Sequence, residues 1–136
     1  MILLDTNIIS EAMKPGGDRA VLLWLDDQAL ETLFLSTISL AELRFGIATL
    51  PAGRRKDRLG DELDGRILPL FEDRLLPFDK TAADAYGRLR AQARAAGRSI
   101  ETADGYIAAI AVANRLSVAT RDVGPFKAAG VDVIVP

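Results

Sequence analysis

Four carboxylates stand where a folded chain often gathers reactive groups. Two of them follow predicted strands, and two lie in the first turns of predicted helices. They are Asp5, Asp122, Glu42 and Asp104. In open α/β sheets, ligands bind at the carboxyl ends of the strands, so acids placed there are candidates for a site.

Asp5 carries the clearest signal of the four. It ends the apolar run Met1–Leu4, which is typical of a short strand buried on both faces in a parallel sheet. A carboxylate at the edge of an apolar core must be compensated by hydrogen bonds, by a cation or by a shifted pKa. The sequence therefore raises the question of what compensates Asp5.

If the strands before Asp5 and Asp122 are adjacent, all four acids converge at one edge of the sheet. Like charges that close raise one another's pKa unless a cation neutralises them. Oxygen ligands suit Mg²⁺ or Mn²⁺, and a chain without histidine or cysteine has no typical zinc ligands, thiolate nucleophile or Ser-His-Asp triad. Such a site activates water and stabilises a phosphodiester transition state, which predicts metal-dependent phosphodiester hydrolysis.

Three of the acids also have simpler interpretations. Ser39 and Glu42 have the spacing of a capping box, in which the glutamate only satisfies backbone donors. Asp104, at the head of an apolar stripe, is compatible with stabilisation by the helix dipole. Asp122 is compatible with an ordinary turn residue.

The elements that must position these acids alternate between strands and helices. Strands are predicted at 1–4, 33–35, 75–78, 117–120 and 131–135. Helices are predicted at 20–30, 39–50, 54–66, 81–96 and 102–115. The order predicts one domain over 1–136, an α/β/α sandwich with a mainly parallel sheet of four to five strands.

Composition narrows the classes of function. The net charge of −2 gives no global basic field, so contact with nucleic acid requires a local patch. The basic run 54–58 is interrupted and followed by acids, which favours a solvated helix face. No signal peptide pattern and no bilayer-spanning apolar stretch is found, so we expect a cytoplasmic protein without membrane contact.

Four segments, in this order, resemble PIN-domain ribonucleases and more narrowly the VapC toxins of bacterial toxin–antitoxin pairs, in their FitB-like branch. They are Leu4–Ser10, Ile38–Gly46, Thr102–Ala108 and Ala119–Asp122. The resemblance covers the whole chain and includes Leu76–Asp79 and the closing Val133–Pro136. It implies a PIN fold and endoribonuclease activity.

The resemblance also implies a site and partners. Asp5, Glu42, Asp104 and Asp122 would surround Mg²⁺ or Mn²⁺, with Asn7 and Thr120 as polar supports. The family implies a homodimer and a small DNA-binding antitoxin that covers the active site, in a heterotetramer or larger complex. Operator DNA would be bound only through the antitoxin.

One departure and one alternative remain open. Many family members carry asparagine where Asp122 stands and an acid three residues later, where this chain has Pro125. A PIN domain that acts only as an antitoxin-binding module is the alternative to a ribonuclease. A phosphorelay receiver would need an acidic pair after the first strand, and a haloacid dehalogenase would need an aspartate at Asn7.

Overall fold

The apolar run after Met1 forms the centre of the sheet. In the computed structural model, which describes residues 1–136, β1 (Ile2–Leu4) pairs in parallel with a strand on either side. The sheet has the order β3-β2-β1-β4-β5, and every pairing is parallel. The other strands are β2 (Leu33–Ser36), β3 (Leu75–Leu76), β4 (Ser117–Ala119) and β5 (Val133–Ile134).

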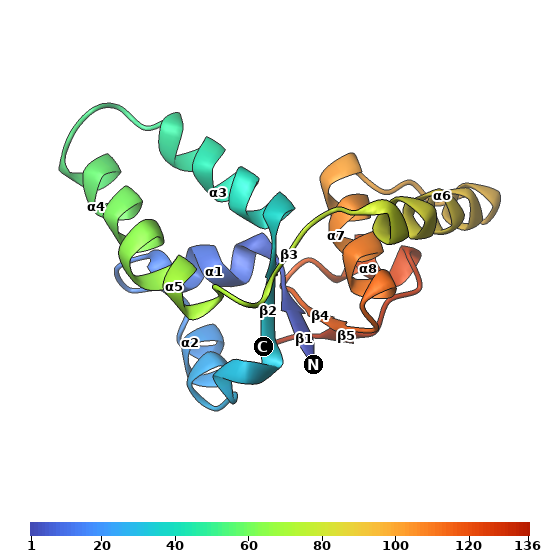
Figure 1. Cartoon of the computed structure of the whole chain (residues 1–136), viewed down its shortest axis with the longest axis horizontal. Helices are drawn as coiled ribbons and strands as arrows, with labels where there is room; N and C mark the ends of the chain where they lie inside the picture. Colours follow the sequence, from blue (N-terminus) through green and yellow to red (C-terminus); the bar gives the residue numbers. More distant parts are fainter.

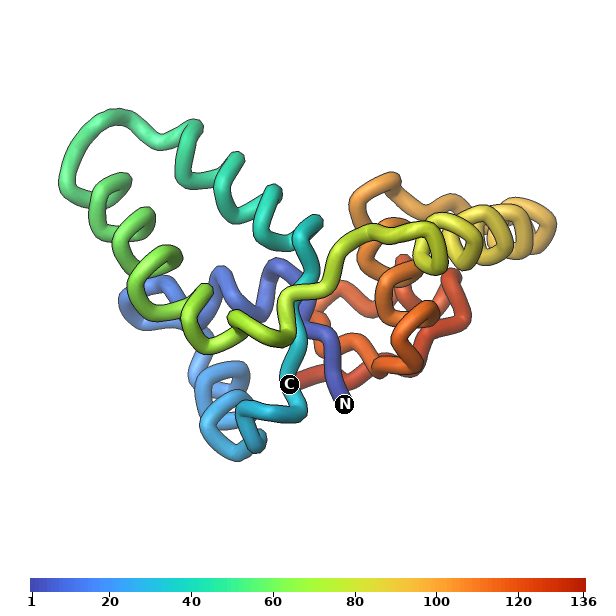
Figure 2. Tube along the Cα trace, in the orientation of Figure 1, coloured from blue at the N-terminus to red at the C-terminus, as the bar shows by residue number.

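Helices cover both faces of this sheet (Figure 1). On one side lie α1 (Thr6–Met13), α2 (Arg19–Asp26), α3 (Thr37–Ala48), α4 (Arg54–Glu62) and α5 (Leu68–Leu70). The 3₁₀ turn η1 (Leu30–Thr32) and the π-helical turn η2 (Leu63–Ile67) complete that side. After β3 the trace crosses over to α6 (Lys80–Ala95), α7 (Thr102–Ala113) and α8 (Val123–Ala128) (Figure 2). No helix has the length and apolar character needed to cross a membrane.

Alternating residues of the central strands feed two separate cores. Leu3 and Val118 are fully buried in the cluster formed with α6, α7 and α8. Leu4 and Ala119 are fully buried in the cluster formed with α1 and α3. Successive side chains of a strand point to opposite faces, so burial on both faces accounts for the continuous apolar run at the N-terminus.

The sheet topology selects one crevice for a ligand. From β1 the chain adds β2 and β3 on one side, and then returns past β1 to add β4 and β5 on the other. The strand order therefore reverses between β1 and β4. In open parallel sheets, the carboxyl ends of strands at such a switch point border the ligand-binding crevice. Asp5 and Asp122 follow these two strands.

The predicted α/β sandwich with a parallel sheet is confirmed, and two helices correct the prediction. Thr6 and Asn7 begin α1, whereas the sequence suggested only a cap and a turn after Asp5. The segment after Asp122 was also expected to be a turn, yet it forms α8 with Pro125 in the first helical turn. Proline is tolerated there because the first backbone N–H groups of a helix have no partner within the helix.

Gly17 allows the tight connection between α1 and α2. A Cβ at this position would lie 2.1 Å from the backbone oxygen of Glu11, closer than any real contact. The adjacent Asp18 caps α2 by accepting hydrogen bonds from the backbone N–H groups of Ala20 and Val21. The turn thus fixes both the end of α1 and the start of α2.

We predict that Gly17→Ala destabilises the protein by about 2 kcal/mol or more, because the added methyl group meets backbone that no rotamer change can move. Gly60→Ala in α4 is the matched control, since nothing lies within 4 Å of its Cβ position. Alanine in a helix is favoured over glycine by up to about 1 kcal/mol, so Gly60→Ala should be neutral or stabilising. Urea unfolding measures both; equal midpoints for the two variants would contradict the prediction.

Candidate functional site

Asp5 occupies the carboxyl end of β1 and is 5 % exposed. Its Oδ1 accepts a hydrogen bond of 2.8 Å from the backbone N–H of Thr6, so Asp5 is the N-cap of α1. Its Oδ2 accepts one of 2.8 Å from the hydroxyl of Thr120, at the end of β4. Burial raises the pKa of Asp5, and these hydrogen bonds offset the effect only in part.

Thr120 and Asn7 connect Asp5 to the loop that follows β4. Thr120 is fully buried, and its single proton goes to Asp5, so its oxygen accepts from the backbone N–H of Asp122 at 2.9 Å. Asn7 Nδ2 donates to Asp5 Oδ2 at 3.3 Å, and Asn7 Oδ1 accepts from the backbone N–H of Arg121 at 3.3 Å. Both residues therefore hold the Asp5 carboxylate against the loop that carries Asp122.

Glu42 is held by Thr6, which overturns the capping-box interpretation. The N-cap of α3 is Ser36, whose hydroxyl accepts from the backbone N–H of Ser39 at 3.0 Å. Ser39 thus lies inside the helix, and Glu42 is too far along it to satisfy its first donors. Instead, Glu42 Oε1 accepts a hydrogen bond of 2.6 Å from the hydroxyl of Thr6, which immediately follows Asp5. The exposed Glu42 is tied in this way to the end of β1.

Asp104 lies in the first turn of α7 and is half-buried. The helix dipole alone would lower the pKa of an acid at this position. Burial instead raises the pKa of Asp104 to about 6, with added repulsion from Asp5, Asp122 and Glu42. The dipole interpretation therefore does not describe the dominant influence on this residue, which is a partly desolvated group among like charges.

Asp122 is exposed and precedes α8 without capping it. The turn at this point is made by the hydroxyl of Thr120, and the Asp122 carboxylate makes no hydrogen bond of its own. A plain turn role would require the aspartate side chain to bond nearby backbone. Its repulsion raises the pKa of both Asp5 and Asp104, so it lies near both carboxylates.

One open hollow of about 450 Å³ gathers the predicted residues, and no apolar residue lines it. Its lining comprises Asp5, Thr6, Asn7, Ser10, Glu11, Lys14, Glu42, Asp104, Arg121 and Asp122. The four predicted carboxylates come from four different elements or their ends and meet here. Thr120 lies beneath the hollow rather than in its wall.

The charges in this hollow fall into two groups. Glu11 pairs with Lys14 and with Arg121, whose Nη1 lies 2.7 Å from Glu11 Oε1, and Arg121 also contacts Asp18 at 3.3 Å. These contacts lower the pKa of Glu11. None of the four predicted carboxylates forms an ion pair with a lysine or arginine. The hollow therefore holds four negative charges that the protein itself does not neutralise.

Sequence reasoning missed Glu11 and Thr6 as members of this site. Glu11 is 7 % exposed, and its partner Arg121 stands more than a hundred residues later in the chain. One signal was available: Asn7, Glu11 and Lys14 recur at helical spacing and form a polar stripe along α1. That stripe is the face that α1 turns toward the hollow.

The donor chemistry of the hollow suits a hard divalent cation. Carboxylate, hydroxyl and amide oxygens are the ligands that Mg²⁺ and Mn²⁺ prefer, and four unpaired acids supply the charge that such an ion balances. No group of three or more acidic side chains is already arranged to hold an ion. Occupation would thus require the carboxylates to draw together from their positions around the hollow.

A family model described as PIN domain matches residues 2–131. The chain belongs to the PIN domain family. Its carboxylate hollow therefore lies in a PIN domain, at the switch point of the PIN sheet.

Three named relatives align with the whole of this chain. It is 57 % identical to the plasmid stability protein StbB of Pseudomonas syringae, covering 98 % of that protein. It is 55 % identical to VapC ribonuclease Y4jK of Sinorhizobium fredii, covering 97 % of it, and 50 % identical to toxin FitB of Neisseria gonorrhoeae, covering 98 %. The expected resemblance to the VapC and FitB group is confirmed.

Two solved structures share the fold closely. The crystal structure of FitAcB from Neisseria gonorrhoeae matches with a TM-score of 0.96 at 50 % identity, covering 100 % of this chain and 98 % of that one. The structure of FitAB bound to the IR36 DNA fragment matches with a TM-score of 0.94 at 48 % identity, covering 98 % and 94 %. The order and placement of the elements are thus those of this branch of the PIN family.

We predict that Asp104→Asn stabilises the metal-free protein at neutral pH. A carboxyl whose pKa rises on folding from 3.8 to about 6 binds its proton more readily in the folded state. Its ionisation therefore lowers the free energy of unfolding as pH rises through that window. The amide has no proton to lose, and with solvent screening the gain is on the order of 1 kcal/mol.

Denaturant unfolding in EDTA at several pH values measures this effect. The difference between Asp104→Asn and wild type should be small below the ordinary aspartate pKa and grow toward neutrality. Asp132→Asn, an exposed aspartate outside the hollow, is the control and should show no such growth. A constant difference across the pH range would show that the Asp104 carboxylate is not repelled as described.

Proposed function

We propose that this PIN domain, formed by residues 1–136, is a Mg²⁺- or Mn²⁺-dependent endoribonuclease and the toxin of a toxin–antitoxin pair. The observation that carries the proposal is the set of four unpaired carboxylates around one polar hollow. Such a set raises the free energy of the protein without a cation, as the raised pKa values of Asp5 and Asp104 indicate. A function that uses a cation explains why the set is present.

Asp5, Glu42, Asp104 and Asp122 are the residues that would hold the ion. A bound divalent ion supplies an activated water and balances the charge that develops on a phosphodiester during hydrolysis. The polar supports have separate tasks. Thr120 and Asn7 fix the orientation of the Asp5 carboxylate, and the Thr6 hydroxyl fixes that of Glu42.

The Arg121–Glu11 ion pair has a positioning task in this proposal. Arg121 bridges Glu11 of α1 and Asp18 at the start of α2, while its backbone N–H donates to Asn7. The pair fixes the loop that carries Asp122 against α1. It also engages the guanidinium group, so Arg121 is not free to neutralise the four carboxylates.

The relatives support the choice of substrate and role. Relatives that share half or more of the residues over the full length carry the names VapC ribonuclease and toxin FitB. An RNA phosphodiester is accordingly the proposed substrate. Which RNA is cut is left to loop shape and surface charge, because a hollow of carboxylates reads no base sequence.

The proposed partners follow the same relatives. We infer that a small DNA-binding antitoxin covers the hollow, and that the toxin forms a homodimer within a heterotetramer or larger complex. The neighbouring structure of FitAB bound to DNA supports binding of operator DNA by such a complex, with the antitoxin making the contact.

We predict that the purified chain cleaves single-stranded RNA when Mg²⁺ or Mn²⁺ is present and not in EDTA. Asp5→Asn and Asp104→Asn should each lower kcat/KM by roughly a hundredfold or more, because each removes a charge that the ion and the transition state require. Asp132→Asn should retain wild-type cleavage. Gel analysis of a labelled RNA over time gives the rates.

Two results would contradict the assignment. Equal cleavage by wild type, Asp5→Asn and Asp104→Asn would show that the hollow is not the catalytic site. Absence of cleavage with either ion, together with tight binding of the antitoxin, would favour a PIN domain that serves only as a binding module.

A further inference from the structure

The most positive stretch of the chain lies outside the carboxylate hollow. Residues 85–100 contain four arginines and no acid, in a chain whose net charge is −2. These arginines are Arg88, Arg90, Arg94 and Arg98, and none of them forms an ion pair. Unbalanced charge of one sign on a single stretch raises the question of what anion it meets.

Three of these arginines line an open hollow of about 760 Å³. Arg90 and Arg94 lie on α6, and Arg98 follows its end, with Tyr86 and Ser99 as polar neighbours. Residues four apart on a helix share a face and are separated by about 6 Å along the axis. Arg90 and Arg94 therefore present two guanidinium groups at a spacing that suits successive phosphates of an extended strand. We name this hollow the arginine surface.

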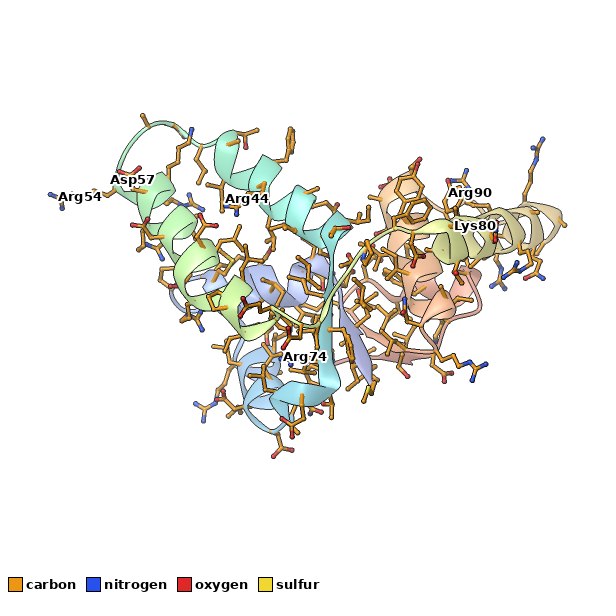
Figure 3. The ribbon with its side chains drawn as sticks, viewed as in Figure 1. Arg44, Arg54, Asp57, Arg74, Lys80 and Arg90 are labelled. Carbon is orange, nitrogen blue, oxygen red and sulfur yellow. The ribbon has the colours of Figure 1, made fainter.

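Arg90 is held in position rather than free in solvent. Its Nη1 donates a hydrogen bond of 2.9 Å to the hydroxyl of Tyr86, and its guanidinium carbon lies 5.5 Å from the centre of the Tyr86 ring. Tyr86 is itself fixed against Tyr106 and Phe78. Figure 3 places Arg90 on α6, the helix that packs along α7. A preorganised guanidinium group loses less entropy when it binds a phosphate.

The arginine surface begins next to the carboxylate hollow. Gly105, the residue after Asp104, packs so closely on α6 that a Cβ would lie 2.9 Å from Tyr86 Cε2 and 3.7 Å from Arg90 Cδ. From there the surface continues along α6 to Arg98. A strand bound at the Asp104 end of the hollow thus has cationic side chains beside its flanking nucleotides.

The basic run on α4 is less suited to bind a polyanion. Arg54 and Arg58 share their hollow with Asp57, Asp61 and Glu62. Figure 3 shows Arg54 extended into solvent at the outer end of α4. The alternation of charge there agrees with the solvated helix face that the sequence favours.

We infer that the arginine surface binds the phosphate backbone of RNA beside the scissile bond. The inference rests on the proposed ribonuclease function, because it is the carboxylates that create the need. Four unpaired acids repel a phosphate chain, so affinity for RNA must come from cations next to them. Guanidinium groups pair with phosphate oxygens in a bidentate manner, and arginine supplies this contact without reading sequence.

The test is binding of a short fluorescein-labelled single-stranded RNA of mixed sequence, followed by anisotropy in EDTA so that no cleavage occurs. In Arg94→Gln/Arg98→Gln the dissociation constant should rise roughly tenfold at low salt. The slope of log affinity against log salt should fall by about 1.4, at about 0.7 for each lost phosphate contact on a single strand. Thermal unfolding checks that the variant is folded.

Arg19→Gln/Lys127→Gln is the matched control. It removes the same charge from two exposed residues of α2 and α8 that form no ion pair. It should bind RNA as wild type does, with an unchanged salt slope. Equal weakening in both double variants, no weakening in either, or no binding by wild type would overturn the inference. Loss of polyglutamate binding in the arginine variant alone, with RNA binding intact, would assign the surface to an acidic polypeptide instead.

Cleavage assays separate this inference from the proposed function. With Mg²⁺ or Mn²⁺, Arg94→Gln/Arg98→Gln should raise KM and leave kcat near the wild-type value, since neither arginine lines the carboxylate hollow. If wild type cleaves no RNA yet the anisotropy result holds, the nuclease proposal fails and the RNA-binding surface stands. If wild type cleaves and the arginine variant binds and cleaves equally well, the surface falls and the nuclease proposal stands.

Discussion

The structure depends on the placement of one carboxylate at the end of a buried three-residue strand. Asp5 caps α1, accepts a hydrogen bond from Thr120 of the neighbouring strand and receives another from Asn7. These contacts join the central strand, the first helix and the loop before α8 at a single side chain. Because burial still raises its pKa, Asp5 remains a group whose charge needs a partner from outside the chain.

The distribution of ion pairs shows that this need is selective. Arg121 and Lys14 lie in the same hollow and are both engaged with Glu11. Elsewhere, Arg44 pairs with Asp64 and Arg66 with Glu62, so acids on α4 and η2 are balanced by nearby cations. The four carboxylates alone are left without one. Proteins commonly accept a loss of stability at a site where the chemistry requires it.

Much of the fold could be predicted because its signals are local. The runs before Asp5 and before Thr120 are apolar on both faces, which specifies central strands of a parallel sheet. Helix α1 was missed because it begins directly after a strand with no linker, and α8 because Gly124 and Pro125 are typical of a turn. In both places the geometry depends on contacts with residues distant in the sequence.

The candidate site divides in the same way. The residue types and their order indicated that Asp5, Glu42, Asp104 and Asp122 belong together, and the structure brings them to one hollow. The contacts that orient them were beyond sequence reasoning. A capping box is a local pattern, but Glu42 is bonded to Thr6, a residue 36 positions away. Likewise, the pairing of Arg121 with Glu11 exists only because the sheet brings β1 and β4 together.

The opposite burial of Leu3 and Leu4 has a consequence for how this chain tolerates inherited insertions and deletions. A gain or loss of one residue within β1 would exchange the two faces, place each leucine in the wrong core and displace Asp5 along the sheet. Three residues leave no length to absorb such a slip. Changes of length should accumulate instead in exposed connections such as 49–53, where Gly53 adopts a positive φ.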